Sequence, residues 1–100
     1  MRNPVQWSDG PSKNGKIYKY PIRDTAVTLE IPELARILSV REQRGQIMLW
    51  ALVEPDAPLR ERRIVIIGTG HDMPNGRLDF IETFFMANGD LVFHAFEVLT

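Results

Sequence analysis

Histidine is the side-chain type best suited to proton transfer near neutral pH, and the sequence holds two, His71 and His94. His71 follows a glycine-rich turn and precedes Asp72, whereas His94 lies within an apolar stretch. Two imidazoles and one carboxylate suffice to bind zinc or iron, so a site of these three residues is conceivable. Because their spacing matches no local metal motif, we instead expect a packed strand histidine and a loop-bracing histidine, with no metal and no cofactor.

Other catalytic arrangements are also missing from the sequence. No Ser or Thr stands beside a histidine and an acid in a recognised order, and scattered carboxylates do not form an acid–base pair without geometry. With no cysteine there is neither a thiolate nucleophile nor a disulfide framework. We therefore predict that the protein is not an enzyme.

The segment 68–76, GTGHDMPNG, is rich in glycine and follows the apolar run Ile64 to Ile67. It lacks the spacing of a dinucleotide fingerprint and the Lys of a phosphate loop, and no helical pattern follows it. The segment therefore fails as a nucleotide motif.

Three arginines stand within four residues in the segment 60–63, RERR. Guanidinium groups recognise phosphate and carboxylate well, so Arg62 and Arg63 are candidate ligand or partner contacts. The alternative is a solvated start of a strand, with the arginines offset by the neighbouring Glu61.

The stretch 42–58, EQRGQIMLWALVEPDAP, is the centre of the expected fold. Its strand, Ile47 to Val53, is apolar at every position, so we expect cover on both faces, from the chain's own core or from a second copy. An Arg44-Gly45 turn joins it to residues 37–43, with Gly45 at a position that demands positive φ. The turn sets the register: Leu38 and Val40 face Ala51 and Leu49, while Ile37, Ser39 and Arg41 lie beside Leu52, Trp50 and Met48.

Arg41 and Trp50 fall on the same face of this hairpin, where a cation–π pair is possible. A mixed aromatic and cationic face is typical of a partner-binding surface or a subunit interface. It is equally typical of the margin of a core. Both residues are retained as candidate contacts.

The remaining strands follow from period-two patterns and turns. Residues 16–22 form a strand that Pro21 restricts to an edge, and 27–31 form a half-buried strand. The run 64–67 is a second interior strand. Residues 77–86 and 91–99 form a hairpin through Asn88-Gly89. Its expected register pairs Phe84 with Phe93, Met86 with Leu91, Phe85 with Val92, Thr83 with His94 and Ile81 with Phe96.

Seven strand candidates without a helical period predict an all-β fold, a small antiparallel sandwich or partly closed barrel of about six or seven strands. Residues 1–15 mix Pro, Gly, Asn and Ser and are interpreted as a flexible N-terminal extension, with 16–100 as a single β domain. Within the extension only Trp7 could anchor the segment on the domain or on a partner.

The composition of the chain limits the kinds of partner that we expect it to bind. The chain has 100 residues, 12 basic against 13 acidic, and no apolar run of membrane-spanning length. We therefore expect neither a membrane nor a nucleic-acid partner, and a cytoplasmic location. The strands that are apolar on both faces predict a homo-oligomer. The basic excess before residue 64 and the acidic excess after it have two interpretations, charge complementarity between strands within one sheet or opposite patches that support self-association.

Four segments in this order resemble a family of small uncharacterised proteins from bacteriophages and bacteria, known as a domain of unknown function. They are EQRG at 42–45, WALV at 50–53, GTGH at 68–71 and HAFE at 94–97, and the likeness extends over residues 16–98. The resemblance implies a compact phage or prophage accessory protein in the cytoplasm of a bacterial host. It supplies no activity, and residues 1–15 fall outside it.

Two hypotheses from different classes follow. In the first, the protein is a non-enzymatic interaction module that occupies a surface of a host protein, one involved in defence, and inhibits it. In the second, it is a homo-oligomeric small-ligand or nucleotide-binding protein in which Arg62, Arg63 and His71 close a pocket at a subunit boundary.

Overall fold

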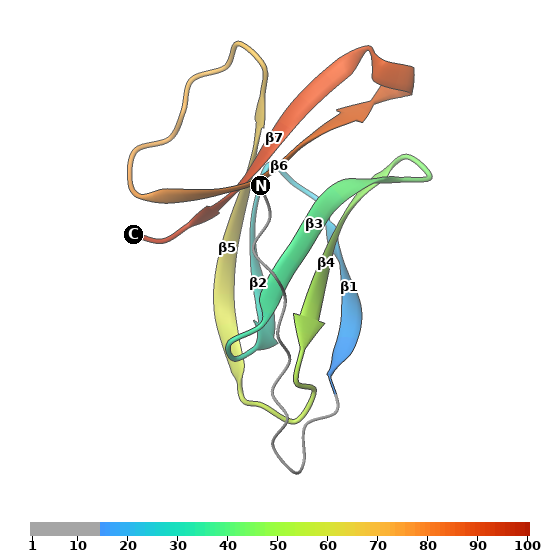
Figure 1. Cartoon of the computed structure of the whole chain (residues 1–100). Coiled ribbons are helices and arrows are strands. Elements are labelled where there is room, and N and C mark those ends of the chain that lie inside the picture. Colours follow the sequence, from blue (N-terminus) through green and yellow to red (C-terminus); the bar gives the residue numbers. More distant parts are fainter. Residues whose placement is uncertain (1–14) are drawn as a thin grey trace.

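A computed structural model describes residues 15–100 of the chain (Figure 1). Seven strands account for most of these residues, together with one short 3-10 turn, η1. Their bounds are β1 (Lys16–Ile22), β2 (Ala26–Pro32), β3 (Arg36–Gln43), β4 (Gln46–Val53), β5 (Leu59–Gly68), β6 (Leu78–Met86), η1 (Ala87–Gly89) and β7 (Leu91–Val98). The described residues include no helix long and apolar enough to cross a membrane.

The strands form two antiparallel sheets. Sheet A has the order β1-β4-β3, and sheet B has the order β2-β5-β7-β6. In Figure 1 the two sheets lie against each other, and the β3–β4 and β6–β7 hairpins diverge at one end. The predicted all-β sandwich of about seven strands is confirmed, and the sheets do not close into a barrel. Pro21 lies in β1 at an edge of sheet A, as predicted.

The core lies between the sheets and is built from alternate residues of each strand. Leu49, Ala51 and Val53 of β4 have no exposed surface, and Ile64 of β5 is equally buried. Their neighbours in sequence point away from the core, because side chains alternate across a strand. Within residues 15–100 only one face of β4 is fully covered, and the expected cover on the second face, where Met48, Trp50 and Leu52 are partly buried, is not supplied by them.

Both predicted hairpin turns are present. Arg44 and Gly45 have φ of 52° and 82°, and Asn88 and Gly89 have φ of 56° and 93°, the backbone of two-residue turns that match strand twist. The hydrogen bond from the Asp90 N–H to the Ala87 carbonyl, at 3.1 Å, closes the second turn. Four of the five pairs expected in the β6–β7 hairpin are observed, from Met86↔Leu91 back to Thr83↔His94.

Two β-bulges shift the strand register, so the predicted residue pairs beyond each bulge are wrong. In β3 the register shifts between Ile37 and Ser39, so Ile37, not Leu38, lies opposite Ala51. In β6 it shifts between Phe80 and Glu82, so Phe80, not Ile81, lies opposite Phe96. A bulge adds one unpaired residue to one strand, and every pair beyond it moves by one position.

Candidate functional site

The outer face of sheet A carries Trp50 at its centre. We call this outer face the Trp50 face. It comprises the β4 residues whose side chains point away from the core and the residues that pair with them on β1 and β3. It consists of Ile17, Lys19, Pro21, Arg36, Ser39, Arg41, Met48, Trp50 and Leu52. Ile17 is 61% exposed and Trp50 is half-buried. The face thus combines apolar side chains with three cations and has no carboxylate among its nine members.

Arg41 and Trp50 share this face, as predicted, but they do not form the expected cation–π pair. The Arg41 Nε donates to Oε2 of Glu82 on β6, at 2.6 Å. The other carboxylate oxygen of Glu82 accepts the backbone N–H of Val40, at 3.1 Å. Glu82 therefore joins the edge of sheet A to the edge of sheet B, and it orients Arg41 at the rim of the Trp50 face.

The edges of the sheets are poorly suited to strand addition. At the β1 and β2 edges, Pro21 and Pro32 each lack the N–H that a pairing strand needs. The other two edges, β3 and β6, meet through Glu82. A partner of this protein is consequently expected to bind a face of a sheet, not an edge.

The side chain of Arg62 is engaged by hydrogen bonds within one chain. Its Nε and Nη2 donate to both carboxylate oxygens of Glu97 on β7, and its Nη1 donates to the Ala35 carbonyl at 3.0 Å. The hydrogen bonds to Glu97 raise the pKa of Arg62 above its ordinary value, against the effect of burial. Arg62 thus ties β5 to β7 and to the turn between β2 and β3.

Arg63 and His71 lie apart from Arg62 and from each other. Arg63 points to the outer face of sheet B, opposite in direction to Arg62, and within residues 15–100 it has no hydrogen-bond or ion-pair partner. His71 follows the far end of β5, where its N–H donates to the Gly68 carbonyl at 3.0 Å. There it lines a hollow of about 340 Å³ with Asp90. One chain does not bring these three residues into one pocket.

His94 is held between two hydroxyl groups. Its Nε2 lies 2.8 Å from Oγ1 of Thr69, and its Nδ1 lies 2.8 Å from Oγ1 of Thr83. These contacts fix the imidazole between β5 and β6. Within the described part of the chain, no three His, Cys, Asp or Glu side chains are placed to hold a metal ion.

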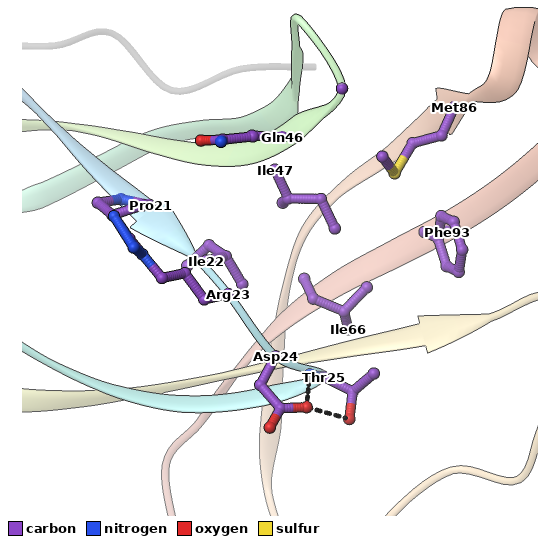
Figure 2. A pocket seen from close by; sticks show the side chains of 11 residues that line it. Pro21, Ile22, Arg23, Asp24, Thr25, Gln46, Ile47, Ile66, Met86 and Phe93 are labelled. Carbon is purple, nitrogen blue, oxygen red and sulfur yellow. Dashed lines mark hydrogen bonds between the residues drawn. The ribbon is translucent and has the colours of Figure 1, made fainter.

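The sheets leave a cleft of about 540 Å³ where the two hairpins diverge, and Figure 2 shows it from close by. Ile22 and Ile66 form its floor, each 5% exposed. Ile47, Met86 and Phe93 form partly buried walls. Sequence reasoning missed this cleft. The available signal was the position of Ile47 and Met86, apolar residues beside the two hairpin turns.

Sheet B also has an apolar outer face. Phe80 and Phe85 are 60% and 61% exposed, and the ring of Phe80 packs edge-on against Phe96 with centroids 5.6 Å apart. We call this the Phe80 face. Its apolar members are Val65, Ile67, Leu78, Phe80, Phe85, Val92, Phe96 and Val98, and the same registers place the polar side chains of Thr28, Arg63, Thr83 and His94 on this face. Trp7, the remaining candidate contact, lies outside the residues that the structure describes.

Residues 15–100 thus form a small all-β sandwich domain with a cleft between its two hairpins and two sheet faces that these residues leave uncovered. The chain belongs to the family described as Domain of unknown function (DUF7352), whose model matches residues 13–100. This agrees with the resemblance to an uncharacterised domain family. No curated protein and no solved structure matched the chain in the searches.

Proposed function

We propose that the protein is a non-enzymatic interaction module that binds a partner protein through the Trp50 face. The observation that carries the proposal is this face, which residues 15–100 leave uncovered, with an aromatic centre and three basic side chains, one of them paired with Glu82, on a sheet whose edges resist strand addition. A partly exposed tryptophan flanked by basic groups suits a partner that presents an apolar pocket ringed by carboxylates.

The identity of the partner is proposed from the resemblance to phage and bacterial proteins. We propose a phage or prophage accessory protein that acts in the cytoplasm of its bacterial host. Its partner would be a host protein, one involved in defence, which it inhibits by occupying a surface.

A quantitative pull-down from bacterial lysate tests the proposal, with wild type and surface variants as baits. Lys19→Glu reverses a charge on the Trp50 face at an exposed position, and Trp50→Ala removes its centre. A specific partner should be depleted about tenfold or more by either change, because central aromatic and charged contacts dominate interfaces. Arg63→Ala, on the other sheet, is the matched control and should retain the partner.

Circular dichroism and thermal unfolding of each bait must show a folded protein. A partner that both Trp50-face variants retain at wild-type levels would contradict the proposed surface. Loss of the partner with Arg63→Ala alone would instead move the contact to sheet B.

The second hypothesis, a ligand pocket closed by Arg62, Arg63 and His71, finds less support. The donors of Arg62 are engaged by Glu97 and Ala35. Arg63 and His71 are separated along β5 by five residues or more, which is about 16 Å of extended strand. A pocket from these residues would need a second subunit.

A further inference from the structure

The cleft between the two hairpins is polar at one end and apolar at the other. In Figure 2 the side chains of Ile47, Ile66, Met86 and Phe93 surround a common space. In the same view the guanidinium of Arg23 is drawn beside Pro21, away from that space, and Gln46 is drawn apart from it, above Ile47. The lining of the cleft is therefore amphipathic. Its volume of about 540 Å³ falls within the range of small-molecule sites.

Arg23 supplies a cation at the polar end. It is exposed, and within residues 15–100 its guanidinium has no hydrogen-bond or ion-pair partner. The other charged residue that lines the cleft is Asp24. Its Oδ1 accepts a hydrogen bond from the Thr25 N–H, at 2.7 Å, within the same turn. An anion at the polar end would meet Arg23.

We propose that this cleft binds a single-chain amphiphile with an anionic head group. The alkyl chain lies between the two sheets against Ile47, Ile66, Met86 and Phe93, and the head contacts Arg23. The shared chemistry is an alkyl chain that ends in a carboxylate or a phosphate. The site shares only Pro21 with the Trp50 face, and its ligand contacts are argued from Arg23 and the apolar residues between the sheets, so the proposal is independent of the proposed function.

Isothermal titration with four ten-carbon probes tests the head group: decanoate, decyl phosphate, decanol and decyltrimethylammonium, all kept below micelle formation. The two anions should bind saturably and about three- to tenfold more tightly than decanol, because an exposed charge-assisted contact is modest. The cation should bind most weakly. The stronger of the two anions identifies the head-group class.

Chain length tests the apolar end. Affinity for the anions should rise about fourfold per added methylene from hexanoate upward, and then level off when the cleft is full. Met86→Ala enlarges that end and should move the plateau to a longer chain. A purely structural role of Met86 would change stability without moving this plateau.

Methyl NMR places the ligand. Signals of Ile22, Ile47, Ile66 and Met86 should shift on addition of decanoate, whereas Met48 and Met73, which lie outside the cleft, should not. Arg23→Gln should weaken both anions about three- to tenfold and leave decanol unchanged. Arg63→Gln, on the outer face of sheet B, is the matched control and should change none of these affinities. No saturable binding of either anion up to millimolar concentration, or shifts spread over all methyl groups, would overturn the proposal.

Discussion

Arg62 shows how one side chain decides between a binding role and a structural one. The sequence places it in an arginine cluster suited to anions, but the fold places the carboxylate of Glu97 against it. Both side chains are largely buried, with exposed fractions of 22% and 13%. A guanidinium so engaged is available to an external anion only if Glu97 is displaced.

We therefore predict that Arg62→Ala destabilises the protein by about 2 kcal/mol, since it leaves the Glu97 carboxylate and the Ala35 carbonyl without their donor. Urea unfolding followed by circular dichroism measures the change in the free energy of unfolding. In a domain of this size the melting temperature should fall by about 10 °C.

Arg63→Ala is the matched control, and its effect should stay within about 0.5 kcal/mol because Arg63 is exposed. Equal stability of the Arg62 variant and the wild type would contradict the structural role. It would return Arg62 to the set of candidate ligand contacts.

At the scale of elements, sequence patterns predict most of this fold because the turns are locally encoded. Arg44-Gly45 and Asn88-Gly89 both adopt positive φ, and they fix the register of the residues next to them. The joint position of Arg41 and Trp50 on one face follows from that register. These features depend on residues close in sequence, which is why they are predictable.

The features that the sequence does not predict depend on residues far apart in the chain. The β6 bulge and Glu82 lie where β6 meets β3. Glu82 accepts a hydrogen bond there from the backbone N–H of Val40, which is 42 residues away in sequence. The pairing of Arg62 with Glu97 spans 35 residues. The cleft requires the two hairpins to diverge. Patterns of period two carry no information on such contacts.

The junction between β3 and β6 gives a prediction at this scale. Glu82→Ala should cost about 1–3 kcal/mol, because it leaves the buried Val40 backbone N–H without an acceptor. Glu82→Gln keeps an oxygen for Val40 but loses the charge opposite Arg41, so its cost should be smaller.

Hydrogen exchange measured by NMR locates the effect. The Val40 amide should exchange faster in Glu82→Ala, well before the global unfolding limit, while amides in the β2–β5 ladder keep their protection. Asp79→Ala, at an exposed position of the same strand, is the control. Unchanged protection at Val40 would show that Glu82 does not hold the two edges together.

For the whole molecule, the two uncovered faces differ in the partner they suit. The Trp50 face carries three basic side chains, of which Arg41 is paired with Glu82, and contact between two copies of this face would bring the like charges of the others together. The Phe80 face carries a band of apolar side chains, with His94 and Thr83 among them and Arg63 at one end, and is the more suitable for contact between identical chains. Both faces can be used at once, because they lie on opposite sides of the sandwich.

The area of the Phe80 face limits how tightly two copies of the chain can bind each other through it. Three strands, β5, β6 and β7, about 4.8 Å apart and about 20 Å long give roughly 300 Å² of flat face per copy. Two copies then bury roughly 600 Å², which is below the range of stable specific interfaces and typical of weak, transient contacts. We therefore predict a dimer that forms in the micromolar range and dissociates on dilution.

Light scattering coupled to size exclusion, from about 1 to 200 µM protein, measures this equilibrium. The average mass of the wild type should rise with concentration above the 11.5 kDa of one chain. Phe80→Glu with Phe85→Glu should keep it monomeric, since both rings are already more than half exposed and their loss leaves the core intact. A wild type that remains a monomer throughout would rule out homo-oligomerisation, and a dimer that persists in the double variant would place the contact on another surface.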